Sequence, residues 1–288
     1  MESGKTLIFL HLPKTAGTTL NSILDREYGK KRTLVINGVP SQCVSQLAAM
    51  PIESRRDIML LRGGHFSFGI HQLLPSATTY ITILRDPVKR VVSNYYHVLE
   101  TQWHPLYEKL TSSRMSLEEY VTSGIAPELD NGQTRRIAGV EGIPFGQCTE
   151  SSLAEATANM DRYFSFVGLT EFFDESLIRM SDILGWRKRP IYVDKLRNKK
   201  KPPLISIPDK TIAIIRQLND LDCRLYDQVR SQFEKTDSPE MIDEIRKFRR
   251  VNMLYRAMRK AIAFQNSIHR PIVKKVERFL KSHRNRPS

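Results

Sequence analysis

The sequence lacks the long apolar runs and the cysteine pairs that mark membrane-spanning and disulfide-rich proteins. No apolar run in its 288 residues approaches the roughly 18 to 20 residues that cross a bilayer. About six apolar residues precede Pro13, too few for the apolar core of a secretory signal. Cys43, Cys148 and Cys223 are scattered, with no C-x-x-C pair. We therefore expect a cytoplasmic protein with reduced thiols, without a signal peptide or a transmembrane segment.

Two further scarcities concern metal ligands and negative charge. No group of histidine, cysteine and carboxylate residues has ligand spacing, so we expect no metal site. The 45 Lys/Arg outnumber the 31 Asp/Glu, which gives a net charge of +14. Residues 237–288 hold 14 Lys/Arg and 5 Asp/Glu, a net charge of +9. A basic tail is typical of a solvated face, but also of contact with an anionic membrane, an acidic glycan or a nucleic acid.

The most informative stretch that is present runs from Thr6 to Leu20. Its apolar run, residues 7–10, predicts a buried strand. A loop with Lys14 follows, and residues 18–24 are typical of a helix start. Backbone N–H groups, the helix dipole, the lysine charge and threonine hydroxyls together make an anion site. Because Lys14 precedes the only glycine of the loop, the order GxxxxGK[ST] of nucleotide triphosphatases is missing.

Strand and helix signals alternate along the rest of the chain. Further strands are predicted at residues 33–37, 57–62, 78–84 and 164–169. This alternation predicts an α/β fold with a P-loop-like central parallel sheet flanked by helices, followed by a C-terminal helical extension. Ligands in such sheets bind where the strands end at their carboxyl side. Lys14, His65 and Arg85 each follow a strand, so we expect them at one edge.

The domain boundary is predicted at residues 236–239, which places one domain at 1–236 and a basic amphipathic extension at 237–288. Apolar residues recur there at helical spacing, interrupted by Asn252. We expect Pro271 to end this long helix and a shorter helix to follow. The interpretations left open for the tail are packing or dimerisation surface and interfacial membrane contact.

Several polar segments are candidates for ligand contacts. Arg85 at a strand end and Ser93 in the following helix, predicted over 87–100, are placed to grip one phosphate. The polar residues 131–136 fit a solvated helix face or an acceptor contact equally well. Residues 195–203 form a basic loop, and residues 207–233 are predicted to be helical. His11 lies within the first strand, where we expect it to be packed or hydrogen-bonded.

These motifs resemble, in order, those of sulfotransferases of the heparan sulfate 2-O-sulfotransferase type. Residues 12–19 (LPKTAGTT) resemble the 5′-phosphosulfate loop, and Arg85-Asp86-Pro87 with residues 90–96 resembles the 3′-phosphate site. Gly64-His65-Phe66 resembles the segment with the catalytic base, and residues 131–135 a helix on the acceptor side. The resemblance covers about residues 6–233. The chain departs from the vertebrate enzymes at Gly17, where they often have serine, and at Gly63, where they have a second histidine.

The resemblance implies transfer of a sulfuryl group from 3′-phosphoadenosine 5′-phosphosulfate (PAPS) to a carbohydrate hydroxyl. His65 would act as the general base, and Lys14 would stabilise the leaving phosphate. No metal would be needed. The implied donor-binding residues are Lys14, Thr15, Ala16, Gly17, Thr18, Thr19, Arg85, Ser93, Asn198 and Lys199.

Two other functions stay open beside this one. A phosphoryl-transfer kinase would require Mg²⁺, and no aspartate has the Walker B setting. A non-catalytic protein that binds anionic polymers or membranes would use the basic tail. The expected partner is a glycan acceptor and no nucleic acid, with peripheral membrane contact and a homo-oligomer left open.

Overall fold

The computed structural model describes residues 5–64, 66–140, 142–193, 203–235 and 238–284. Its centre is a five-stranded sheet in which every pair of neighbours is parallel, in the order β2-β3-β1-β4-β5. The strands are β1 (Thr6–Phe9), β2 (Thr33–Ile36), β3 (Leu60–Gly63), β4 (Thr78–Leu84) and β5 (Phe164–Leu169). The predicted α/β fold with a central parallel sheet is confirmed.

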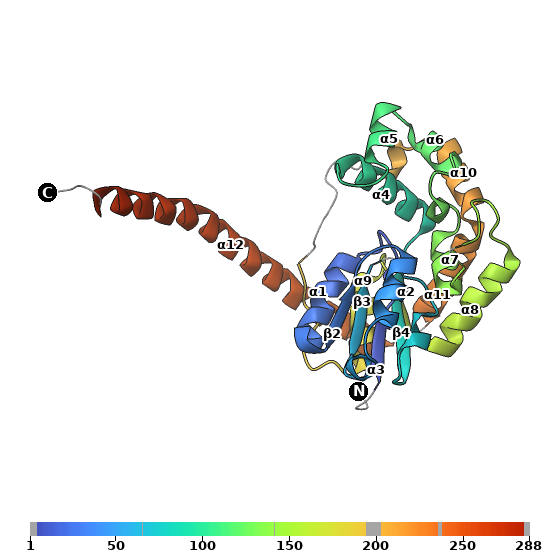
Figure 1. Ribbon diagram of the computed structural model, residues 1–288, viewed down its shortest axis with the longest axis horizontal. Helices are drawn as coiled ribbons and strands as arrows, with labels where there is room; N and C mark the ends of the chain where they lie inside the picture. The colour runs from blue at the N-terminus through green and yellow to red at the C-terminus, as the bar shows by residue number, and fades with distance from the viewer. Residues whose placement is uncertain (1–4, 65, 141, 194–202, 236–237, 285–288) are drawn as a thin grey trace.

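Helices cover both faces of this sheet (Figure 1). The longer helices of the body are α1 (Gly17–Tyr28), α2 (Pro40–Ala48), α4 (Pro87–Glu100), α8 (Glu150–Tyr163), α9 (Phe173–Leu184), α10 (Asp209–Leu218) and α11 (Asp220–Lys235). The shorter ones are α3 (Ile52–Arg56), α5 (Tyr107–Ser112), α6 (Leu117–Thr122) and α7 (Gly132–Ala138), with 3₁₀ turns η1 (Lys30–Arg32), η2 (Ile70–Leu73), η3 (Pro127–Leu129) and η4 (Leu204–Ser206).

The alternation of side chains along the strands divides the core into two layers. Leu7 and Phe9 of β1 face α1 and α9, whereas Ile8 packs with α2, α8 and α11. Both layers are buried, so the strands are apolar on both sides, as expected for a parallel sheet. A third apolar cluster joins α4, α5, α6 and α10. These helices form a lobe beyond the end of the sheet opposite the N-terminus (Figure 1).

The helix predicted over residues 207–233 is two helices. Asn219 separates α10 from α11 and is fully buried. Its side-chain amide donates to the carbonyls of Leu129 (2.9 Å) and Ile215 (3.0 Å), and its Oδ1 accepts from the N–H of Asn131 (3.2 Å). Asparagine competes with helical hydrogen bonds in this way, so the break follows from tertiary partners.

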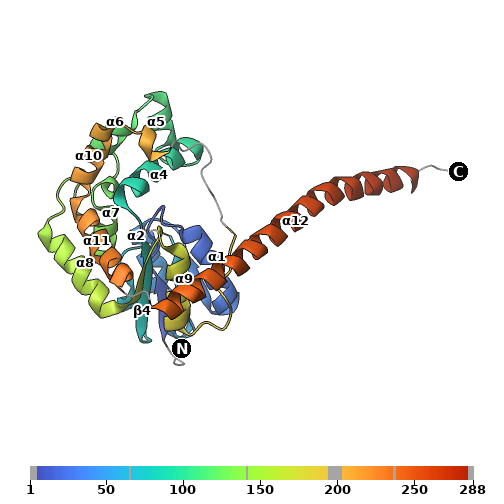
Figure 2. The same cartoon turned by 180° about the vertical axis from the view of Figure 1, so that it is seen from behind.

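The C-terminal helix α12 (Pro239–Arg284) continues through Pro271, so the prediction that this proline ends the helix was wrong. A proline removes one backbone hydrogen bond of a helix. The remaining backbone hydrogen bonds of this long helix keep the chain helical on both sides of Pro271. The first turns of α12 lie against α9, and its remainder projects from the body (Figure 2). Among the described residues, no helix is long and apolar enough to cross a membrane.

Asn252, the polar residue that interrupts the apolar pattern of the tail, has a structural role. Ile245 and Phe248 are buried against the α1 and α9 layer. One turn further, the buried Asn252 accepts the N–H of Tyr192 through its Oδ1 (2.8 Å). The start of α12 therefore packs on the sheet domain. The division into a domain at 1–236 and a helical extension at 237–288 stays a prediction.

Candidate functional site

The loop after β1 has the backbone of an anion site. Lys14 and Ala16 both adopt left-handed conformations, with φ of 70° and 65°. Ala16 is the N-cap of α1 and offers no side-chain acceptor, so no side chain caps the N–H groups of the first turn. Such a helix start favours an anionic ligand.

The threonine side chains of this loop differ in their burial and in their hydrogen bonds. Thr15 is fully buried, and its hydroxyl donates to the carbonyl of Leu12 (2.8 Å). The hydroxyl closes the turn in this structure, and the contact of Thr15 with the donor stays a prediction. Thr19 is also buried, whereas Thr18 is exposed.

His11 packs behind the loop, as predicted. A Cβ at Gly17 would lie 2.0 Å from its imidazole ring, so this position accepts only glycine while the ring stays in place. A serine at this position would place its Cβ against the His11 ring.

The segment after β3 shows a second glycine requirement. Gly63 has φ of 124°, and a Cβ there would lie 2.2 Å from the carbonyl oxygen of Ile36. The following N–H, of Gly64, donates to the same carbonyl (2.5 Å). A histidine cannot replace Gly63 in this backbone, which explains the departure noted in the sequence. His65 lies outside the described residues, as do Asn198 and Lys199.

Arg85 connects the end of β4 with the loop after β1. Its Nη1 donates to the carbonyl of Lys14 (2.8 Å), and its buried Nε has no partner in the structure. Burial lowers the pKa of its guanidinium, while Glu171 and Asp86 oppose this shift. No ion pair of Arg85 occurs within the described part of the chain. A largely buried guanidinium with an N–H group that lacks an acceptor favours the binding of an anion.

Asp86 and Ser93, which follow Arg85 in the chain, belong to the start of α4. The Asp86 carboxylate caps α4 by accepting the N–H of Lys89 (2.8 Å). Ser93 is 8% exposed in the second turn of that helix. No hydrogen bond joins Ser93 to Arg85 in the described residues, so their shared grip on one phosphate stays a prediction.

The segment 131–136 is not a solvated helix face, so that interpretation was wrong, whereas an acceptor contact stays a prediction. Every one of its residues is buried in or beside α7. The carboxylate of Asp222, from α11, caps α7 by accepting the N–H groups of Gln133 (3.1 Å) and Thr134 (2.7 Å). Arg135 forms a buried ion pair with Asp130 (2.5 Å). Buried polar groups need such partners, and the partners come from distant segments that the local pattern does not reveal.

Gln133 connects this network to the site, and the sequence analysis missed it. Its Oε1 accepts the N–H of Arg85 (2.9 Å), and its Nε2 donates to the carbonyl of Arg85 (2.9 Å). The side-chain amide thus holds the backbone of Arg85 on both sides. Nothing in the local sequence indicates this pairing, because 48 residues separate the two.

We expect Gln133→Leu to weaken the binding of adenosine 3′,5′-bisphosphate (PAP), measured by calorimetry, because the Arg85 backbone loses both partners. The free energy of unfolding should fall by about 2 kcal/mol. Asn159→Leu is the matched control. Asn159 is buried in α8 and donates to the carbonyl of Ile137 (3.1 Å), which lies in α7 as Gln133 does. It should lose similar stability and keep PAP affinity. Equal PAP affinities in the two variants would contradict this role of Gln133.

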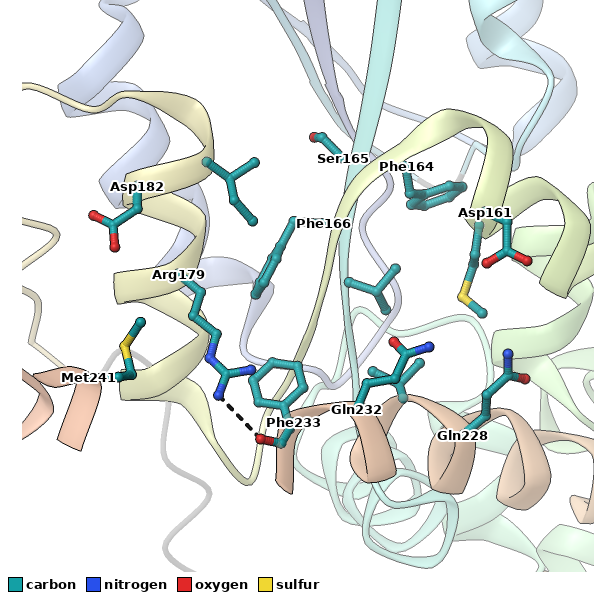
Figure 3. A pocket seen from close by; sticks show the side chains of 14 residues that line it. Asp161, Phe164, Ser165, Phe166, Arg179, Asp182, Gln228, Gln232, Phe233 and Met241 are labelled. Atoms are coloured by element: carbon teal, nitrogen blue, oxygen red, sulfur yellow. Dashed lines mark hydrogen bonds between the residues drawn. The ribbon is translucent and has the colours of Figure 1, made fainter. Parts of the chain in front are cut away.

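A cavity of about 550 Å³ lies away from all of these residues, along the outer side of β5. Figure 3 shows Phe166 and Phe233 in its wall, with Arg179 donating to the Phe233 carbonyl (3.2 Å). None of the predicted site residues lines it. Lys14 and Arg85 follow β1 and β4 at the carboxyl ends of these strands, where ligands of parallel sheets bind.

The comparison with known families agrees with this geometry. A family model for galactose-3-O-sulfotransferases matches residues 2–268. The chain belongs to the galactose-3-O-sulfotransferase family. The family match includes the first part of α12, which packs on the sheet domain.

Individual members show the breadth of the similarity. Human galactose-3-O-sulfotransferase 3 is 27% identical over 251 residues, covering 79% of this chain and 56% of that protein (Homo sapiens). Galactosylceramide sulfotransferase (Homo sapiens) is 24% identical, covering 80% of this chain and 57% of that protein. Heparan-sulfate 6-O-sulfotransferase 1 (Homo sapiens) is 24% identical, covering 82% and 67%. The chain spans little more than half the length of the first two.

The predicted sulfotransferase family is confirmed. The finer resemblance to the heparan sulfate 2-O type stays a prediction, since the relatives described above are of the galactose-3-O, galactosylceramide and heparan-sulfate 6-O types. The described residues contain no group of three or more histidine, cysteine and carboxylate side chains suited to a metal ion.

Proposed function

We propose that this protein transfers a sulfuryl group from PAPS to a hydroxyl of a carbohydrate acceptor. The observation that carries this proposal is the Arg85–Lys14 junction. The buried guanidinium of Arg85, with an unused Nε, donates to the carbonyl of Lys14. Lys14 lies in the loop that leads into α1, and the first turn of α1 has no side-chain cap. Two anion-binding elements in contact suit a donor with two anionic ends.

The 5′-phosphosulfate of the donor would bind the loop after β1, and its 3′-phosphate would bind the region of Arg85. The N–H groups of residues 15–18 and the Lys14 ammonium would hold the 5′-phosphosulfate, and Thr19 would flank it. Arg85 and Ser93 would hold the 3′-phosphate. Asn198 and Lys199 are proposed to close over the donor from the segment that follows residue 193.

The proposed chemistry is an in-line displacement at sulfur. His65 takes the proton of the acceptor hydroxyl as the new oxygen–sulfur bond forms. The bond from sulfur to the bridging oxygen breaks, and PAP leaves with the electron pair. Lys14 stabilises the negative charge on that oxygen. No step needs a metal.

A transfer assay separates this function from that of a kinase. The full chain is incubated with [³⁵S]PAPS and either a galactose-terminated oligosaccharide or a heparan oligosaccharide, with and without EDTA. We expect label in one of the glycans at equal rates in both conditions. Loss of transfer in EDTA, or [γ-³²P]ATP as the productive donor, would refute the proposal.

We also propose a second function for α12, contact with an anionic membrane surface. Val251, Leu254, Met258 and Ile262 follow one another at spacings of three and four, so they form one stripe of the helix. Each is between 37% and 66% exposed. Basic residues accompany the stripe, and a helix of this kind lies in a membrane interface. This contact is compatible with the cytoplasmic location, which stays a prediction.

We expect the double variant Leu254→Ser/Met258→Ser to lose binding to phosphatidylserine vesicles in a flotation assay, with sulfotransfer unchanged. The stripe residues are exposed, so folding should be preserved. Deletion from residue 237 onward is a poorer test, because it removes the buried Ile245 and Phe248. Undiminished flotation would rule the contact out. A change from dimer to monomer in ultracentrifugation, without vesicle binding by either form, would identify a second copy as the partner instead.

A further inference from the structure

Two carboxylates act electrostatically on the Arg85 guanidinium, yet neither forms an ion pair with it in the part of the chain that the structure describes. The charges of Glu171 and Asp86 both oppose the lowering of the Arg85 pKa by burial. The Nε of Arg85 is buried and has no hydrogen-bond partner among the described residues. A buried charge beside a carboxylate is ordinarily paired with it, and the other contacts of the two carboxylates explain this exception.

The carboxylate of Asp86 is engaged in the helix that follows it. Its Oδ1 accepts the N–H of Lys89 (2.8 Å) and thereby caps α4. This contact satisfies an N–H group that the first turn of a helix otherwise leaves without an acceptor. The Asp86 side chain therefore has a partner other than Arg85, and the same question arises for Glu171.

The chain after β5 brings Glu171 to the backbone beside Arg85. Thr170 donates to the carbonyl of Leu84, the last residue of β4, through both its N–H (2.8 Å) and its hydroxyl (2.9 Å). The side chain of the next residue, Glu171, accepts the N–H of Asp86 (3.3 Å). The chain after β5 thus holds the chain after β4 at the residue before Arg85 and at the residue after it.

Three donors hold the Glu171 carboxylate. Besides the N–H of Asp86, the hydroxyl of Tyr226 donates to its Oε2 (3.1 Å), and the ammonium of Lys89 lies 3.7 Å from its Oε1. Tyr226, from α11, is 5% exposed. Burial raises the pKa of Tyr226, and the charge of Glu171 raises it further, so the phenol keeps its proton and donates it. These donors satisfy the carboxylate without Arg85.

We propose that Glu171, held by Tyr226, is a positioning residue of the donor site: it fixes the backbone beside Arg85 while its charge is kept from closing an ion pair with that guanidinium. The proposal rests on the sulfotransferase function proposed above, in which Arg85 binds the 3′-phosphate of the donor. A phosphate and a carboxylate compete for the same guanidinium, so a carboxylate that has other donors leaves it to the phosphate. The charge of Glu171 still stabilises the buried guanidinium while no donor is bound.

Replacements of the two partners in this contact should have opposite effects on the binding of PAP, measured by calorimetry. Tyr226→Phe leaves Glu171 charged and lets its carboxylate turn to Arg85, so PAP affinity should fall about 10-fold, as for the loss of a hydrogen bond to a charged group. Both hydrogen bonds of Glu171 end on Oε2, which an amide oxygen can replace. Glu171→Gln therefore removes only the charge, and PAP affinity should rise about 2- to 5-fold.

The double variant Tyr226→Phe/Glu171→Gln separates this role from a merely structural one. Without the carboxylate, nothing competes with the phosphate for Arg85, so PAP affinity should return at least to that of the wild-type protein. If Tyr226 only supported the local packing, its replacement would lower PAP affinity by the same factor whether residue 171 is charged or neutral. Equal losses in the two backgrounds would overturn the proposal.

Tyr192 provides a matched control. Its side chain is 8% exposed, and its hydroxyl donates to the carboxylate of Asp174 (2.8 Å), as that of Tyr226 does to Glu171. It belongs to the apolar layer of α1 and α9. Tyr192→Phe should lower the melting temperature as much as Tyr226→Phe does and leave PAP affinity unchanged. A similar loss of PAP affinity in both variants would trace the effect to stability and contradict the positioning role.

Steady-state kinetics supply a second measurement and distinguish the two ways of failing. Tyr226→Phe should raise the PAPS KM about 10-fold and leave kcat and the acceptor KM unchanged, because Glu171 acts on a group that holds the donor and not on the reacting atoms. Normal transfer by the wild-type protein, with an unchanged PAPS KM in Tyr226→Phe, refutes the positioning role alone. Absence of transfer from PAPS and of PAP binding in the wild-type protein refutes the proposed function, and the positioning role with it.

Discussion

Replacing Lys14 with methionine should lower kcat for sulfuryl transfer by about 10²- to 10³-fold, the cost of removing one group that stabilises transition-state charge. The change keeps the length of the side chain and removes its charge. The carbonyl of Lys14, which accepts from Arg85 (2.8 Å), is unaffected. PAP affinity should therefore fall less than kcat. Steady-state kinetics and calorimetry with PAP measure the two effects.

A glycine at the same position separates activity from folding. Lys14 has φ of 70°, a conformation that costs a non-glycine residue about 1 kcal/mol or more. Lys14→Gly should consequently keep or raise the melting temperature while losing as much activity as the methionine variant. Retained turnover in both variants would show that Lys14 is a structural residue of the loop.

Replacing His65 with alanine should lower kcat by about 10²- to 10⁴-fold, the usual contribution of a general base. PAP affinity should stay nearly intact, because the base acts on the acceptor. Before His65, the N–H of Gly64 donates to the carbonyl of Ile36, and Gly63 pairs with Ile36 in the sheet. The variant should therefore fold normally, as circular dichroism would verify.

Another histidine, His71, serves as a control for this assignment. His71 hydrogen-bonds with the Tyr80 hydroxyl through its Nδ1 (2.9 Å) and packs beside Phe68. His71→Asn should lower the melting temperature and change kcat little. If His71→Asn abolished kcat and His65→Ala did not, the base would have to be reassigned to His71.

The central sheet was predictable because its signals are local. The predicted strands at 78–84 and 164–169 and the helix at 87–100 coincide with β4, β5 and α4. These segments are β-branched and apolar, or begin with a proline at the first helical position, and neighbouring residues alone produce such patterns. The loop with Lys14 was predictable for the same reason.

Other features depend on partners far away in the chain. Asn219 breaks a helix because it bonds to Leu129, and residues 131–136 are buried because Asp222 caps their helix. Gln133 reaches Arg85 across 48 residues.

The sequence by itself determined the layered α/β fold, the family motifs and the position of Lys14 and Arg85 at strand ends. Apolar periodicity and turn residues act over a few positions, so they can be interpreted without a structure. Only the tertiary structure decided which polar residues are structural and which remain for ligands. Burial and hydrogen-bond partners settle that question, and they arise when distant segments pack together. They give the Thr15 hydroxyl, Asp222 and the residues 131–136 roles within the fold, and they leave the buried Nε of Arg85 without a partner in the described residues.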